Sequence, residues 1–132
     1  MECVPPPGDA ANTAGKSDLL MGRFLAAGRE AGCPLDQMRN FSKAGVILQR
    51  RQLVASAAAR ECDREDGPTE VGFGGARGGG KSYWILAQTG ADDCQRFAGL
   101  KCLLLRRVGK ANIEHFEDLR HRLFGGLKHE FS

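Results

Sequence analysis

The sequence lacks the features that mark a secreted, membrane-spanning or zinc-binding chain. No apolar run approaches the ~20 residues that a membrane-spanning helix needs, and the first residues are Pro-rich rather than basic and then apolar, as in a signal peptide. Its five cysteines are odd in number and widely spaced, with no C-x-x-C pair, which argues against a disulfide framework or a zinc site. We therefore expect reduced thiols, no membrane and a cytoplasmic location.

A strong excess of one charge is also absent. The chain has 19 basic and 16 acidic residues, a net charge of +3. This balance permits an anionic partner but does not by itself indicate nucleic acid. With 132 residues, of which 42% are apolar, the chain is long enough for one domain or part of one.

One stretch carries a chemical signature, the G-x-x-x-x-G-K-[ST] pattern of a phosphate-binding loop: Gly75-Ala76-Arg77-Gly78-Gly79-Gly80-Lys81-Ser82. Glycines let the backbone form a concavity whose N–H groups point at phosphate oxygens, where a larger side chain would block the approach. The pattern predicts that Lys81 contacts the β- and γ-phosphates and that Ser82 offers its hydroxyl to Mg²⁺. The alternative is a flexible Gly-rich linker.

The segments around this motif alternate between two patterns. Residues 71–73 are predicted to end a short strand, and residues 82–88 lack Gly and Pro, as expected of a helix. Residues 89–99, which contain Gly90 and Gly99, are predicted to be a connection. The nearly continuous apolar run 100–105 is typical of a strand buried on both faces. Residues 111–127 form an amphipathic helical pattern, broken at Gly125-Gly126. The order predicts an α/β fold, the start of a P-loop NTPase parallel sheet with flanking helices.

Helical patterns also precede the motif. Residues 1–16 are predicted to form a loose arm, followed by a short helix over 18–31. A further turn or two is predicted at 35–41, where apolar residues recur every three positions. Residues 49–62 have an Ala-rich helical pattern with Arg60 among its polar positions. We therefore expect a small helical segment before the sheet.

A second metal-binding motif is missing. A phosphate-loop enzyme needs a carboxylate at the end of another strand to hold Mg²⁺, but the apolar run ends in Arg106-Arg107, which would repel a metal ion. Two strands are also few for a stable parallel sheet. We expect an incomplete domain, truncated before that motif. Asp92-Asp93 are predicted to be loop or cap residues rather than a catalytic pair.

Three parts of the sequence together resemble one family. Gln52 on its helix, the loop 74–82 and the run Leu103-Leu104-Leu105-Arg106-Arg107 are similar to the start of the ATPase domain of bacteriophage terminase large subunits, motors that drive double-stranded DNA into procapsids. The resemblance covers about residues 44–132. It divides the chain into an arm with short helices, residues 1–43, and the N-terminal portion of a P-loop ATPase domain, residues 44–132.

The resemblance implies a role for each matching residue. Gln52 matches the glutamine that reads adenine, and Arg77 matches an arginine that acts in cis on the γ-phosphate. Arg77 and Lys81 would be catalytic, and Ser82 would hold Mg²⁺. The nucleotide-binding residues would be Gln52, Gly75, Ala76, Arg77, Gly78, Gly79, Gly80, Lys81 and Ser82.

The resemblance also implies ATP and Mg²⁺ as cofactors and the host-cell cytosol as the location. Its partners would be double-stranded DNA, the portal and the small terminase subunit, in a full-length motor that can be oligomeric. The family's second metal-binding motif, coupling motif and nuclease domain match nothing in the sequence, so ATP hydrolysis by this chain alone is not predicted.

Two other interpretations stay open, a catalytically inactive fragment of a gene and another, helicase-like P-loop ATPase. Single residues have plainer alternatives as well. Gln52 would then be an exposed helix residue, and Arg77 would only solvate its loop. Trp84 is predicted to pack in the core rather than to stack on a base.

Overall fold

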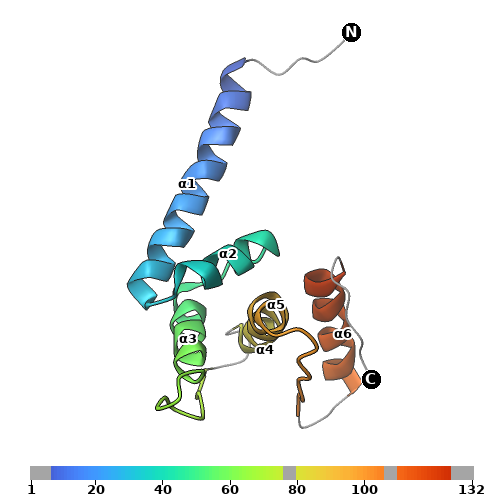
Figure 1. Cartoon of the computed structure of the whole chain (residues 1–132). Helices are drawn as coiled ribbons and strands as arrows, with labels where there is room; N and C mark the ends of the chain where they lie inside the picture. The colour runs from blue at the N-terminus through green and yellow to red at the C-terminus, as the bar shows by residue number, and fades with distance from the viewer. Residues whose placement is uncertain (1–6, 76–79, 106–109, 126–132) are drawn as a thin grey trace.

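The computed structural model describes residues 7–75, 80–105 and 110–125, and within these ranges every regular element is a helix (Figure 1). The elements, with η1 a π-helix, are α1 (Pro7–Ala31), α2 (Leu35–Lys43), α3 (Arg50–Glu61), α4 (Lys81–Leu86), η1 (Ala87–Asp93), α5 (Cys94–Arg96) and α6 (Lys110–Phe124). The predicted α/β fold with a parallel sheet is therefore wrong for the described residues.

The two segments predicted as strands have no partner strand in the described part of the chain. Residues 71–75 contain three glycines, which weaken a strand because they offer no side chain to pack. In the segment 100–105, Leu103 is 84% exposed and Leu105 is 81% exposed. The apolar run predicted burial, but burial of a strand on both faces requires neighbouring strands and covering helices. Among the residues that the structure describes, no strand pairs with this segment, and Leu103 and Leu105 stay exposed.

Three helical predictions are confirmed. The patterns over 35–41, 49–62 and 111–127 correspond to α2, α3 and α6. The last helix ends at Phe124, directly before the predicted break at Gly125. These segments have clear apolar spacing, so local pattern and tertiary packing agree.

Two other segments are more helical than predicted. α1 begins at Pro7 rather than at residue 18, in keeping with the tolerance of proline in the first turn of a helix. The predicted connection over 89–99 is helical as far as Arg96. Gly90 suggested a loop, but it lies inside η1, where a Cβ atom would come within 1.9 Å of Phe124 Cε1. This glycine therefore permits close packing of η1 and α6.

The core lies where α2, α3, α4 and η1 meet the C-terminal part of α1, and α1 extends away from the other helices (Figure 1). Its largest apolar members come from each of the first four helices: Phe24, Met38, Phe41, Leu53 and Trp84. Nearer the start of α1, Leu19 and Leu20 are more than half exposed. Among the described helices, none is both long and apolar enough to cross a membrane.

Candidate functional site

The phosphate-loop motif joins the extended segment that ends at Gly75 to the first residue of α4. Its middle four residues lie outside the described residues: Ala76, Arg77, Gly78 and Gly79. At the far end of the motif, Gly80 has a φ of 77°, in the left-handed region that glycine adopts without strain. Lys81 and Ser82 follow as the first residues of α4. The described part of the motif therefore consists of both ends of the loop.

Lys81 folds back toward the beginning of the motif. Its Nζ atom donates a hydrogen bond of 2.5 Å to the carbonyl oxygen of Gly75, six residues earlier. The ammonium group therefore lies between the first and the last residues of the motif. The ammonium group is charged in either case, but a carbonyl is a neutral acceptor, whereas a phosphate oxygen also carries charge and so forms the stronger bond.

Gln52 reaches the same motif from the first turn of α3. It is only 4% exposed. Its Oε1 atom accepts a 2.8 Å hydrogen bond from the N–H of Gln49, and its Nε2 atom donates a 2.9 Å bond to the carbonyl of Gly80. Gln52 is therefore a buried contact of the loop rather than an exposed helix residue. Both ends of its amide are bound to backbone, so contact with adenine would require new partners.

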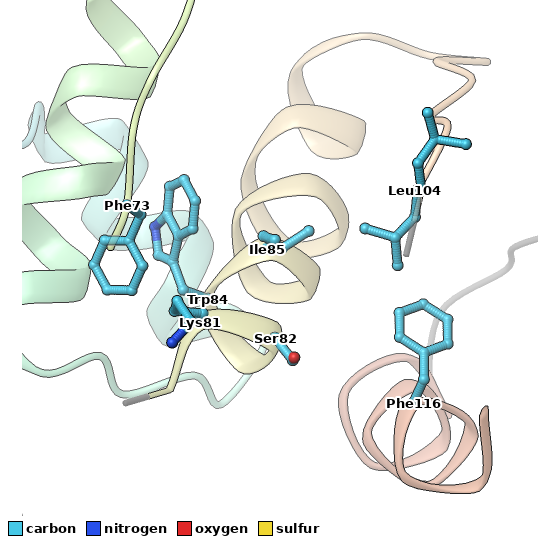
Figure 2. Close-up of a pocket in the computed structure, with 8 residues that line it drawn as sticks. Phe73, Lys81, Ser82, Trp84, Ile85, Leu104 and Phe116 are labelled. Carbon is cyan, nitrogen blue, oxygen red and sulfur yellow. The ribbon is translucent and has the colours of Figure 1, made fainter. Parts of the chain in front are cut away.

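A cavity of about 250 Å³ lies beside α4, with Lys81 and Ser82 among mostly apolar lining residues (Figure 2). On one side of α4, the rings of Phe73 and Trp84 stack with centroids 5.2 Å apart, and on the other side lie Leu104 and Phe116 (Figure 2). The cavity therefore joins the end of the motif to the exposed segment 100–105.

Trp84 is a core residue, as predicted. It is 8% exposed, and its Nε1–H donates a 2.8 Å hydrogen bond to the hydroxyl of Ser56 on α3. The indole therefore both fills apolar space and satisfies its one donor inside the protein. This contact fixes α4, and with it Lys81 and Ser82, against α3.

A separate cluster of polar side chains lies at the centre of the helix packing. Asp92 of η1 has no exposed surface. Arg60 of α3 binds it with two bonds, from Nε at 2.9 Å and from Nη2 at 2.8 Å. Further donors come from α2 and η1: Asn40 Nδ2 at 2.9 Å, Gln37 Nε2 at 3.1 Å and Gln88 Nε2 at 2.9 Å. The carboxylate thus joins α2, α3 and η1.

The hydrogen bonds of this cluster stabilise the charged forms of Asp92 and Arg60. Burial by itself raises the pKa of Asp92, but hydrogen bonds from Arg60, Asn40 and Gln88 outweigh it and hold the pKa below its usual value. The bond to Asp92 in turn raises the pKa of Arg60. Burial raises the pKa of the neighbouring Asp93. The Asp92 carboxylate is therefore ionised and surrounded by donors of the protein itself, which indicates a structural role.

The sequence predictions missed this cluster. The sequence pattern places Arg60 only among the polar positions of its helix, and it predicts Asp92 to be a loop or cap residue. One signal was available, because Gln88 and Asp92 stand four residues apart and would share a face of a continued helix. The sequence pattern predicts that the helix ends at residue 88, because Gly90 indicates a loop.

Comparisons with protein-family models, with curated proteins and with solved structures give no match. Within the described residues, no group of three or more His, Cys, Asp and Glu side chains is placed to hold a metal ion. The resemblance to terminases therefore remains a sequence-based prediction.

Proposed function

We propose that the chain binds ATP with Mg²⁺ through the motif 75–82, as the ATP-binding portion of a terminase large subunit in the cytosol. The observation that carries the proposal is the hydrogen bond from Lys81 Nζ to the carbonyl of Gly75. It keeps the ammonium group within the motif rather than out on the surface of α4. In that position the cation adjoins the loop that would bind the phosphate groups.

The energetics favour an exchange of partners at Lys81. The bond from the Lys81 ammonium group to the Gly75 carbonyl already contains one charged partner, whereas a bond to a phosphate would join two groups of opposite charge and add their Coulomb attraction. Contact with a phosphate would therefore be stronger than contact with the Gly75 carbonyl, which water can solvate once it is released. Ser82, the next residue of α4, would offer its hydroxyl to the Mg²⁺ that accompanies the nucleotide.

The contact between Gln52 and Gly80 also supports the proposal. The two residues are 28 positions apart, and the resemblance assigns both to one nucleotide site. Gln52 holds the residue directly before Lys81, so a nucleotide at the loop would also affect α3. The nucleotide contacts of the proposal depend on the loop and on α3.

In this interpretation Arg77 acts on the γ-phosphate, and double-stranded DNA, the portal and the small terminase subunit are partners of the full-length motor. The chain would supply nucleotide binding to that motor. Hydrolysis by the chain alone is not expected, because the sequence offers no second Mg²⁺-binding carboxylate motif.

Equilibrium dialysis with Mg²⁺-ATP tests the proposal directly. We expect Lys81→Ala to weaken binding about 10- to 100-fold, since it removes one charge-assisted bond. Lys101→Ala is the matched control, because Lys101 is an exposed lysine outside the motif. It should bind ATP as the unchanged chain does.

Circular dichroism of both variants establishes that their helices are retained. Equal affinity of the unchanged chain and Lys81→Ala would rule out the proposed site. An equal loss in Lys101→Ala would show instead that ATP responds only to the overall positive charge.

A further inference from the structure

The cavity beside α4 is large enough for part of a nucleotide. Its volume is about 250 Å³, below the roughly 300–1,000 Å³ of pockets that enclose a drug-sized ligand. It begins at the phosphate-loop motif, because Lys81 and Ser82 are both among its lining residues. A nucleotide held by the motif would therefore extend one of its parts into this cavity, and the lining decides which part fits.

Apart from these two motif residues, the described side chains that line the cavity are aliphatic or aromatic. Ile85 of α4 faces Leu104 and Phe116 across the space (Figure 2). Leu104 is 38% exposed and Leu105 is 81% exposed, so an apolar group placed against them would remove leucine surface from water. A nucleobase has two flat apolar faces that such side chains accept. Of the parts of a nucleotide, the base therefore fits this lining best.

Gln52, which the terminase resemblance assigns to the base, is not placed to read it. Its side chain is buried, with Oε1 bound to the N–H of Gln49 and Nε2 bound to the carbonyl of Gly80. It is also absent from the described lining of the cavity. The indole N–H of Trp84, which does line the cavity, is bound to Ser56. Recognition of a base edge needs donors and acceptors that face that edge, and neither side chain offers one.

We propose that this cavity holds the base of a bound nucleotide by apolar contact, so that the site takes ATP and GTP alike. The inference rests on the proposed phosphate site at residues 75–82, because the triphosphate there would set the position of the base. Phe116 supplies an aromatic ring, and Ile85 and Leu104 supply aliphatic surface. Stacking does not depend on the identity of the base, since every base has a π-face, whereas strong selection requires hydrogen bonds to the base edge.

Equilibrium dialysis with three Mg²⁺-bound ligands tests the inference: ATP, GTP and inorganic triphosphate. We expect the dissociation constants of ATP and GTP to agree within about fivefold, because hydrogen bonds to the base edge are not used. Inorganic triphosphate has no base and should bind about 10- to 100-fold more weakly than ATP, as expected for the loss of base stacking. A larger preference for ATP over GTP would overturn the inference, and so would equal binding of ATP and inorganic triphosphate.

Phe116→Leu separates contact with the base from contact with the phosphates. It should weaken the binding of ATP and GTP about fivefold or more and leave inorganic triphosphate unchanged, because it removes only the ring. Phe97→Leu is the matched control, since Phe97 is a half-exposed phenylalanine outside the described lining, and it should bind all three ligands as the unchanged chain does. Unchanged ATP binding by Phe116→Leu would contradict the inference. An equal loss of inorganic triphosphate would also contradict it, because Phe116 would then support the fold rather than the base.

The same ligands separate this inference from the proposed function. If none of the three binds, or if Lys81→Ala leaves their binding unchanged, both the phosphate site and the base site are wrong. If all three bind equally and Lys81→Ala weakens them equally, the phosphate site stands and only the base site is wrong.

Discussion

Gly80 controls how the phosphate-loop motif enters α4. Its φ of 77° is accessible to glycine and strained for other residues. A Cβ atom at this position would lie 2.5 Å from Gln52 Nε2, the atom that binds the Gly80 carbonyl. A side chain would therefore disturb both the loop and its contact with α3.

We expect Gly80→Ala to lower the free energy of unfolding by about 1–3 kcal/mol, through backbone strain and displacement of the Gln52 amide. It should also weaken ATP binding if the proposed site is correct. Urea unfolding followed by the fluorescence of Trp84, the single tryptophan, measures the first effect. Gly74→Ala is the control, since a Cβ atom there meets nothing within 4 Å. Equal losses in the two variants would contradict this account.

At Asp92 the stabilising feature is a buried charge with five donated bonds. Asp92→Asn would replace one carboxylate oxygen by an amide that faces donors from Arg60 or Gln88. We expect the free energy of unfolding to fall by about 3–5 kcal/mol, as when one partner of a buried pair is removed. Urea unfolding measures this loss. Asp66→Asn, with a side chain 84% exposed, should change stability by about 0.5 kcal/mol or less. A similarly small change at Asp92 would contradict a structural role for the cluster.

The π-helix η1 packs closely against its neighbours on two sides. It follows α4 without interruption and carries both Gln88 and Asp92 into the polar cluster. Its Gly90 lies against the Phe124 ring of α6. Widened turns of this kind are often found where a helix must present particular side chains.

Gly90→Ala should therefore destabilise the protein, although alanine favours helices. We expect a loss of about 1–3 kcal/mol from overpacking against Phe124. In a Phe124→Ala background the same substitution should have a much smaller effect, and a double-mutant cycle from urea unfolding measures the coupling. Gly22→Ala in α1, with no atom within 4 Å of its Cβ, should raise stability by up to about 1 kcal/mol. An equal gain at Gly90 would refute close packing there.

The elements also show which predictions the sequence can support. α2 and α3 are predictable because Met38, Phe41 and Leu53 bury one face of a short amphipathic or Ala-rich helix. The segment 100–105 has an equally clear apolar pattern, but a strand also needs a neighbouring strand, which no local pattern supplies. The sequence does not predict the helix over 89–96, because glycine lowers helix propensity. At Gly90 the close contact with Phe124 requires a glycine inside the helix.

The candidate site likewise has one part that the sequence predicts and another part that it does not. The motif 75–82 is visible in the sequence because its residues are adjacent. The Gln52–Gly80 contact and the Asp92 cluster join segments that lie 28 to 55 residues apart. Such contacts depend on how helices pack, and side-chain patterns within one helix do not contain that information.

In the whole molecule, the Asp92 cluster makes the helices depend on one another. Arg60 binds Asp92 of η1 and also Asp36 of α2, at 2.8 Å in each case. Trp84 of α4 adds a further link, through its hydrogen bond to Ser56 of α3. Loss of the charge at Asp92 would therefore weaken α2, α3 and η1 together, and we expect the core to unfold cooperatively.

Acid should weaken the whole fold through this cluster. The folded-state pKa values of Asp92 and Asp36 lie below their usual values, so their contribution to stability is present above the unfolded pKa and is lost as pH falls through the folded pKa. Asp93, whose pKa is raised by burial, has the opposite effect, because its protonation in acid favours the folded state. Asp92 is fully buried and joins three elements, so we expect its effect to exceed that of Asp93. Urea unfolding between neutral pH and about pH 3 should show a falling free energy of unfolding below about pH 4. Asp92→Asn should flatten this dependence, and an unchanged slope in that variant would place the acid sensitivity elsewhere.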